Sequence, residues 1–138
     1  MKISILERDS LGMDVDMSEV ESLGDVTVYM KTTVEEAAEH IGDADIIIAN
    51  KLPLNEQTLK EAKNLKFIAQ TATGTNNVDF SYTNARGIGV ANVPSYSTDS
   101  VAQHTFALLF YLLEKLSFFD RYVKAETKAT AAALPVWK

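Results

Sequence analysis

Short apolar runs alternate with helical patterns along the first 96 residues of the chain. Runs of strand length, bounded by turn residues, are expected at residues 2–7, 25–31, 44–49, 65–72 and 88–93. This alternation predicts an α/β fold with a parallel sheet. Right-handed crossovers favour a flavodoxin-like, doubly wound sheet of five strands in the order 2-1-3-4-5. The unbroken run Ile46–Ile48 predicts a strand that is buried on both faces.

The longest helical pattern runs from Ser97 to about Lys124. Its apolar residues form two neighbouring stripes and occupy much of the circumference. Such a surface fits a helix between two bodies, and it equally fits a well-buried core helix of one domain. The pattern is lost over residues 125–138, whose structure we leave open. We therefore divide the chain into a domain at 1–96, a long helix at 97–124 and a tail at 125–138.

The bulk composition limits the classes of partner. The 138 residues carry a net charge of −6, and their 13 basic residues are scattered, which argues against a nucleic-acid or anionic-membrane partner. There is no cysteine, so disulfides and thiolate metal sites are excluded. The start of the chain turns polar too soon for a secretory signal. We expect a cytoplasmic protein.

The strand expected at 65–72 leads directly into the stretch Thr71–Asp79, which is rich in Thr, Gly and Asn. Ligands of open α/β sheets bind outside the carboxyl ends of the strands. Gly74 permits a close approach of the backbone and a positive φ, and the N–H groups after it are expected to open a helix that attracts an anion. A plain turn between strand and helix is the alternative. Lys51, which follows another strand, either attracts the same anion or is simply solvated.

Other motifs are weaker. Gly87 and Gly89 imitate the start of a dinucleotide fingerprint, but they end a helix instead of opening one. Ser100 and His104 lie one helical turn apart, yet no carboxylate is placed to complete a triad. His40 is expected to be solvated on a surface helix. No cluster of His and carboxylates has the spacing of metal ligands.

Two further binding classes share the predicted sheet. A receiver-like signalling domain needs an acidic pair after the first strand, which Glu7 and Asp9 could imitate. It also needs an Asp after the third strand and a Lys after the fifth, and Asn50 and Asn92 stand near those positions instead. A flavodoxin that binds FMN needs a phosphate loop after the first strand, and none is found there.

Four segments together resemble one family. They are Ala49–Leu54, Ala69–Asp79, Ala85–Pro94 and Tyr96–Leu108. In order and spacing they are similar to the N-terminal part of the D-isomer-specific 2-hydroxyacid dehydrogenases, above all the glycerate dehydrogenase (hydroxypyruvate reductase) branch. The resemblance covers residues 1–124.

The resemblance implies an NAD-dependent, two-domain enzyme that transfers hydride between NADH and a small 2-oxo acid such as hydroxypyruvate or glyoxylate. It implies that this chain supplies the flavodoxin-like substrate-binding domain and the interdomain helix, on which Thr105 approaches the cofactor. It also implies a set of substrate-binding residues, of which the loop residues hold the substrate carboxylate through backbone N–H groups. The set comprises Lys51, Thr73, Gly74, Thr75 and Asn76.

The same resemblance points to missing parts. The family's catalytic Arg, Glu and His and its Gly-rich Rossmann loop have no counterpart among these residues, and His104 is not the catalytic His. We therefore expect a truncated or isolated substrate-binding domain that is inactive alone. A non-catalytic α/β binding or interaction domain is the alternative. Without a second domain the apolar helix is expected to cause self-association, for example as a homodimer.

Overall fold

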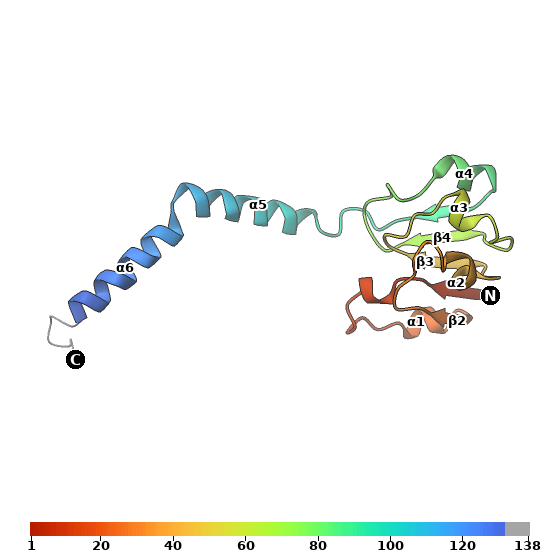
Figure 1. The fold of residues 1–138 in the computed structure, drawn as a ribbon, viewed down its shortest axis with the longest axis horizontal. Coiled ribbons are helices and arrows are strands. Elements are labelled where there is room, and N and C mark those ends of the chain that lie inside the picture. The colour runs from red at the N-terminus through yellow and green to blue at the C-terminus, as the bar shows by residue number, and fades with distance from the viewer. Residues whose placement is uncertain (132–138) are drawn as a thin grey trace. The chain divides into compact units, whose positions relative to one another are not determined.

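The computed structural model describes residues 1–131, with side chains as far as Glu126, and divides the chain into two units that meet at Ser95 and Tyr96. The first unit holds a sheet of five parallel strands in the order β2-β1-β3-β4-β5 (Figure 1). The strands are β1 (Lys2–Ile5), β2 (Asp25–Val28), β3 (Ile46–Ala49), β4 (Phe67–Gln70) and β5 (Gly89–Ala91). The predicted strand order is confirmed, although each strand is shorter than expected.

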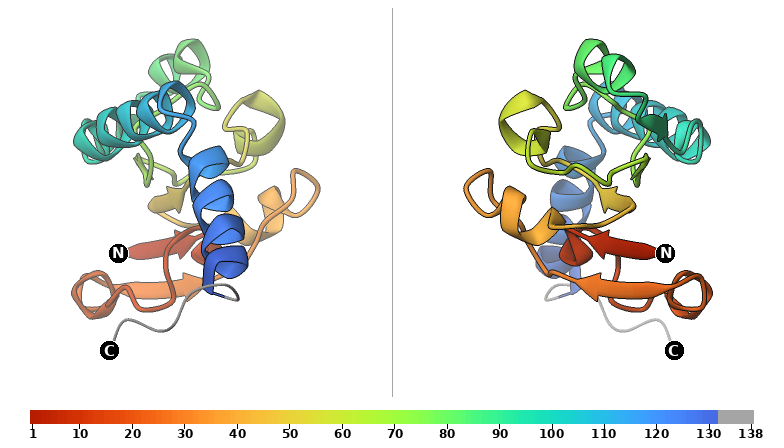
Figure 2. Two further views of the ribbon diagram at one scale, coloured as in Figure 1. Left: turned by 90° about the vertical axis from the view of Figure 1, so that its left-hand side faces the viewer. Right: turned by 90° about the vertical axis from the view of Figure 1, so that its right-hand side faces the viewer.

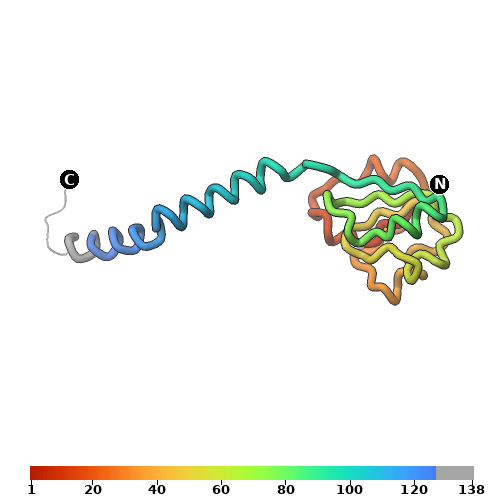
Figure 3. The backbone as a smooth tube through the Cα atoms, turned by 90° about the horizontal axis from the view of Figure 1, so that it is seen from above, coloured from red at the N-terminus to blue at the C-terminus, as the bar shows by residue number. Residues whose placement is uncertain are grey.

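Short helices fill the connections of the first unit, and Figure 3 follows the same path as a Cα trace. They are η1 (Arg8–Ser10), α1 (Ser18–Glu21), α2 (Ala37–Ile41), α3 (Glu56–Leu59) and α4 (Phe80–Ala85). The Asn55 side chain accepts the backbone N–H groups of Gln57 and Thr58 and so caps α3. Gly87, with φ 68°, ends the turn after α4.

The core lies on one face of the sheet, where α2 and α3 contribute their apolar residues. It is a single cluster formed by Leu6, Ala37, Ile41, Ala44, Ile47, Ala49, Leu52, Leu54, Leu59, Ala62, Leu65, Ile68, Val78 and Ile88. Ile47 and Ile68 are paired across β3 and β4 and are both fully buried. Burial of each such side chain stabilises the fold by about 1.5–3 kcal/mol.

The opposite face of the sheet is only partly covered. Ile3 pairs with Ile46, which pairs with Phe67, so these three side chains share that face. Ile3 is buried, whereas Ile46 and Phe67 are half-buried. The prediction that the run Ile46–Ile48 is buried on both faces is therefore met on the core face only, because no element of the first unit fully covers its other residues.

The second unit consists of two helices, α5 (Thr98–Leu113) and α6 (Leu116–Ala131) (Figures 1 and 2). They replace the single helix predicted over residues 97–124. The break occurs because Lys115 adopts φ 50°, which ends the helical hydrogen-bond series of α5, and its carbonyl then accepts the N–H groups of Phe118 and Phe119. The tail predicted from residue 125 is helical as far as Ala131, and the rest of it lies outside the described residues. Over the part of the chain that is described, no helix has both the length and the apolar character needed to cross a bilayer.

Candidate functional site

Two loops meet at the carboxyl edge of the sheet, one after β3 and one after β4. Leu54 and Val78 form a parallel bridge between them. The Leu54 N–H donates to the Asn77 carbonyl (2.7 Å), and the Asp79 N–H donates to the Leu54 carbonyl (2.8 Å). The Asn77 side chain adds a bond from its Nδ2 to the Leu52 carbonyl (2.9 Å). The sequence stretches that contain Lys51 and Gly74 are thus joined into one structure.

Gln70, at the end of β4, forms hydrogen bonds with both loops. Its side chain is buried, and its Nε2 donates both to the Asn50 carbonyl and to Asn77 Oδ1 (3.0 Å). Its Oε1 is buried without a hydrogen-bond partner among the described residues. A buried amide that bridges two loops restricts their relative movement, and so it fixes the geometry of the edge.

The loop between β4 and α4 presents a row of unused backbone donors. Over residues 1–131, no protein acceptor receives the N–H groups of Thr73, Gly74, Thr75 and Asn76. The loop itself is anchored, because Thr73 Oγ1 donates to the Val93 carbonyl (2.9 Å) and Asn92 Nδ2 donates to the Thr73 carbonyl (2.7 Å). Free N–H groups on a fixed, exposed loop form a surface that can bind an anion.

Two details of the predicted loop are wrong. The N–H groups after Gly74 do not open a helix: residues 76 and 77 form a turn, in which the Val78 N–H donates to the Thr75 carbonyl (3.0 Å), and α4 begins only at Phe80. Gly74 does not use a positive φ either; among the described glycines only Gly42 and Gly87 do. A Cβ built on Gly74 would meet no atom within 4 Å, so the packing of the protein around this position does not require a glycine.

Lys51 lies on the neighbouring loop, and its backbone is held by Glu7. The Glu7 carboxylate accepts the N–H groups of Asn50 (2.6 Å), Lys51 (2.9 Å) and Leu52 (3.1 Å). The Lys51 side chain is exposed and forms no ion pair with any described residue. Its ammonium group is therefore available to a bound anion at this edge.

The residues predicted on the long helix lie in the second unit. Thr105 is exposed on α5, and its Oγ1 donates to the Val101 carbonyl (2.8 Å), which leaves the oxygen free to accept a bond from a cofactor. Ser100 and His104 form no hydrogen bond with each other in the described structure, so no catalytic pair is present. No group of His, Cys, Asp and Glu among the described residues could hold a metal ion.

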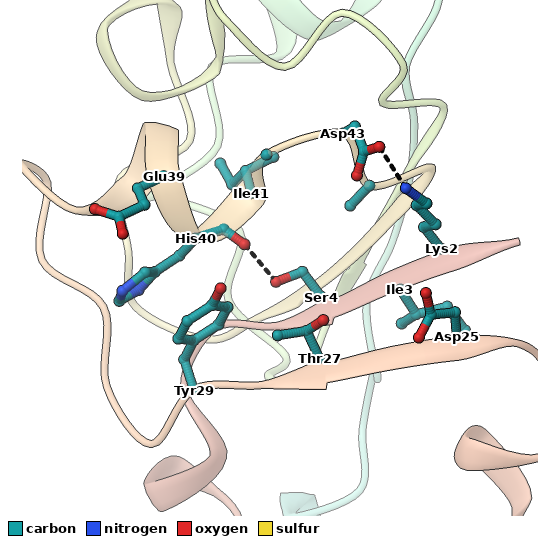
Figure 4. A pocket seen from close by; sticks show the side chains of 12 residues that line it. Lys2, Ile3, Ser4, Asp25, Thr27, Tyr29, Glu39, His40, Ile41 and Asp43 are labelled. Carbon is teal, nitrogen blue, oxygen red and sulfur yellow. Dashed lines mark hydrogen bonds and ion pairs between the residues drawn. The ribbon is translucent and has the colours of Figure 1, made fainter.

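A separate hollow lies between β1, β2 and α2 (Figure 4). The prediction that His40 is a solvated residue on a surface helix is wrong, because its ring and its carbonyl both form contacts here. Its ring stacks on Tyr29 at 3.7 Å between centroids, its Nδ1 pairs with Thr32 Oγ1 (2.9 Å), and its carbonyl accepts Ser4 Oγ (2.7 Å). These contacts occupy the His40 ring and carbonyl within the fold. They dock α2 on the sheet, so we assign the hollow no ligand.

Two ion pairs of the first unit lie at the amino ends of the strands, opposite the candidate site. The hydrogen bond to the Asp43 carboxylate raises the pKa of Lys2 above its ordinary value of 10.5. The bond from Lys66 Nζ, at 2.7 Å, lowers the pKa of Asp45 below its ordinary value of 3.8. These pairs tie β1, β3 and β4 together at the end where no ligand is expected.

The sequence did not predict the structural roles of four residues at this site: Glu7, Gln70, Asn77 and Asn92. A usable signal exists, since Glu7, Gln70 and Asn92 each stand at or just past the end of an apolar strand. Polar residues at those positions lie at the edge of a parallel sheet where ligands bind. Their partners could not be read from the sequence, because the contacts join residues 7 to 45 positions apart.

The amino-acid sequence of this chain is similar to those of known proteins. A family model described as "D-isomer specific 2-hydroxyacid dehydrogenase, catalytic domain" matches residues 5–134. A hydroxypyruvate reductase of Blautia hydrogenotrophica is 37% identical over 127 residues, which are 89% of this chain and 39% of the relative. A glycerate dehydrogenase of Methylorubrum extorquens is 38% identical over 112 residues, which are 80% of this chain and 35% of the relative.

Solved structures agree with the sequence relatives. An acyclic imino acid reductase in complex with NADPH and D-Arg superimposes with a TM-score of 0.78 at 25% identity, covering 91% of this chain and 41% of that one. A 3-phosphoglycerate dehydrogenase of Entamoeba histolytica with bound NAD+ gives 0.70 at 23% identity, covering 80% and 38%. The chain thus spans about two fifths of the length of the proteins that it matches.

Proposed function

Because the chain belongs to the family of D-isomer-specific 2-hydroxyacid dehydrogenases, we propose that it holds the substrate carboxylate for NAD-dependent interconversion of small 2-hydroxy and 2-oxo acids. The observation that carries the proposal is the row of unused backbone N–H groups at residues 73–76. Hydroxypyruvate and glyoxylate are the favoured substrates, since relatives over most of this chain are named hydroxypyruvate reductase and glycerate dehydrogenase.

The chemistry of this part is binding and orientation. A substrate carboxylate would accept the N–H groups of Thr73, Gly74, Thr75 and Asn76, which carry no net charge and need no proton transfer. The ammonium of Lys51 would add attraction, and it would remain exposed to water until the substrate arrives. Held in this way, the carbonyl carbon next to the carboxylate has a fixed position, which is what hydride transfer requires. Bound NAD would supply the hydride, with Thr105 proposed as its contact on α5.

A titration of the 138-residue chain with glyoxylate, followed by amide NMR, tests the proposal. We expect the amide signals of Gly74 and Asn76 to shift in a saturable way with millimolar ligand. Glycolaldehyde is the control, because it keeps the size of glyoxylate and replaces the carboxylate by an uncharged group. Absence of shifts with glyoxylate, or equal shifts with both compounds, would contradict a carboxylate site.

Turnover gives a second measurement on the same protein. The proposed role of the described residues is to bind the carboxylate, and none of them is proposed as the proton donor or acceptor at the substrate carbonyl. We therefore expect no NADH-dependent reduction of hydroxypyruvate by the 138 residues alone. A measurable rate that disappears when Gly74 is replaced would show that more of the catalytic apparatus lies in this chain than we propose.

The second unit supports a self-associating function as the alternative. Large apolar side chains are exposed all round α5 and at the start of α6, with Leu112 71% and Leu113 65% exposed. Exposed apolar patches of this extent mark interaction surfaces. Light scattering should detect dimers or larger species, and Leu112→Glu should shift them towards monomer. Leu23→Glu in the first unit, where Leu23 is 60% exposed, is the matched control and should leave the association unchanged.

A cytoplasmic location is part of the proposal. It is supported by the dependence of the proposed reaction on NAD(H) and by a composition without cysteine, which fits a reducing compartment.

A further inference from the structure

The loop after β3 is built around a carboxylate that belongs to the chain itself. Glu7 follows β1 in sequence and lies 43 to 45 residues away from the groups that it binds. Its Oε2 accepts three successive backbone N–H groups, from Asn50 at 2.6 Å, Lys51 at 2.9 Å and Leu52 at 3.1 Å. Its Oε1 lies 3.1 Å from the Lys51 nitrogen.

Three successive N–H groups that converge on one oxygen form an anion-binding nest. The same geometry would hold a free carboxylate or one face of a phosphate, because both offer oxygens with several lone pairs. In this chain the nest is filled by Glu7, which is only half-buried. The nest is thus accessible enough to exchange with an external anion if the Glu7 carboxylate were removed.

The backbone around Glu7 is fixed, so the carboxylate is delivered to the nest with little freedom. The neighbouring Arg8 is buried, its N–H donates to the Tyr29 carbonyl (3.0 Å), and its guanidinium donates to the carbonyls of Gly12 (3.0 Å) and Val15 (3.0 Å). Ser10 Oγ bonds the Glu7 carbonyl (2.7 Å). Because its backbone is fixed, Glu7 loses little conformational entropy when its side chain occupies the nest.

The position of the nest relates it to the candidate site. β3 lies between β1 and β4, and neighbouring strands are about 4.8 Å apart, so the ends of β1 and β4 are separated by about 10 Å. Glu7 thus follows a strand whose end is about one Debye length from the end of the strand that leads into the loop at residues 73–76. Glu7 also places a negative charge beside the backbone of Lys51, which offsets part of the attraction that Lys51 offers to a second anionic group.

We propose that Glu7 determines the charge of the acid that this edge accepts. It occupies the second anion nest, so among the two described loops an external carboxylate finds free N–H groups at residues 73–76, and a second anionic group on the same ligand finds the neighbouring nest already filled by a negative charge. The edge thereby selects monoanionic 2-oxo acids over dianionic ones, which are dicarboxylic or phosphorylated. The selection rests on the proposed function, whereas the existence of the filled nest does not.

Chemical rescue tests the filled nest. In Glu7→Ala the nest is vacated, and acetate should refill it and raise the melting temperature in a saturable way at about 10 mM. Sodium chloride at equal ionic strength should not do so. Amide NMR should show acetate-dependent shifts at Asn50, Lys51 and Leu52 in Glu7→Ala and none there in the wild type. If the variant is too unstable for NMR, the acetate-specific rise in melting temperature in excess of that seen in the wild type still decides the question.

Two variants complete the design. Glu7→Gln keeps the shape and fills the nest with an amide oxygen, so acetate should raise its melting temperature no more than it raises that of the wild type. Glu36→Ala is the matched control, because the Glu36 carboxylate accepts only one backbone N–H, that of Thr33 (2.9 Å), and forms no nest. An acetate effect on Glu36→Ala that exceeds the effect on the wild type, or one on Glu7→Ala that does not exceed it, would overturn the proposal of a filled nest.

Charge selection is measured separately with glyoxylate and its dianionic analogue ketomalonate. In the wild type, glyoxylate should bind more tightly than ketomalonate. Glu7→Gln removes the negative charge of Glu7 and should improve the affinity for ketomalonate about two- to threefold relative to glyoxylate, which is the size expected for a screened interaction near a protein surface. An unchanged ratio would refute the selection by Glu7. If instead glyoxylate fails to shift the Gly74 amide even in the wild type, the proposed function fails, while the rescue experiment still reports on the nest.

Discussion

Replacing Gly74 by Ala should separate anion binding from stability. A Cβ at this position would meet no atom within 4 Å, and the φ of Gly74 lies outside the left-handed region. The folded state can therefore accept the methyl group without strain, while the unfolded chain loses conformational freedom. We expect Gly74→Ala to stabilise the protein by about 0.4–1 kcal/mol. Such a gain raises the melting temperature by a few degrees, which calorimetry can measure.

The same methyl group should weaken the binding of glyoxylate. It would stand on the loop whose N–H groups are proposed to bind the carboxylate, in the space that the ligand needs for close approach. A loss of about 1.4 kcal/mol corresponds to tenfold weaker binding, and we expect at least that loss in an NMR titration. Binding that is as tight as in the wild type would refute the assignment of the carboxylate to this loop.

Gly87→Ala is the matched control, because a Cβ there also meets no atom within 4 Å. The φ of Gly87 is 68°, however, and the left-handed conformation costs a residue with a side chain about 1–2 kcal/mol. Gly87→Ala should therefore lower the melting temperature and leave the affinity for glyoxylate unchanged. If both variants lose stability equally, the inference from backbone conformation is wrong.

Three further substitutions test the fold. Arg86→Ala removes the guanidinium that donates to two backbone carbonyls at and just after the end of α3, and it should cost about 2–4 kcal/mol in chemical denaturation, with Arg86→Lys intermediate. Asn55→Ala removes the cap of α3 and should cost about 1 kcal/mol in the same assay. Asp45→Asn tests the pH dependence: because Lys66 lowers the pKa of folded Asp45, its stabilisation is present above pH 3.8 and lost on further acidification. Wild type and Asp45→Asn should therefore differ in melting temperature at neutral pH and converge as the pH falls below that value.

The order of the strands could be predicted because it depends on local patterns and general rules of connection. Apolar runs marked the five strands, and the alternation with helices fixed a parallel sheet, whose order is confirmed. The lengths of the strands were overestimated, since apolar residues continue beyond the residues that form the hydrogen bonds of the sheet. Leu6 and Leu65, for example, are buried in the core although neither belongs to a strand. Burial and strand pairing are different properties, and periodicity reports mainly the first.

The break between α5 and α6 is a feature that the apolar pattern of the sequence did not predict. Nothing in the apolar pattern around Lys115 interrupts the helical period, and lysine is a good helix former. The residue nevertheless adopts φ 50°, a conformation that a local propensity argument would not choose. A break of this kind is a property of the folded chain as a whole, so sequence periodicity could not reveal it.

The sequence predicts an anion site at this edge of the sheet, but not which backbone groups are free to form it. Free N–H groups were expected after Gly74, and the loop after the third strand was expected to contribute only the Lys51 side chain. Only the structure shows that the N–H groups of the loop after β3 are satisfied by Glu7 and those at residues 73–76 by no described residue. A chain that needed one general anion site would have no reason to fill the first nest with its own carboxylate. The arrangement is useful if the edge must hold a single negative group in one place, which is what orientation of a small 2-oxo acid requires.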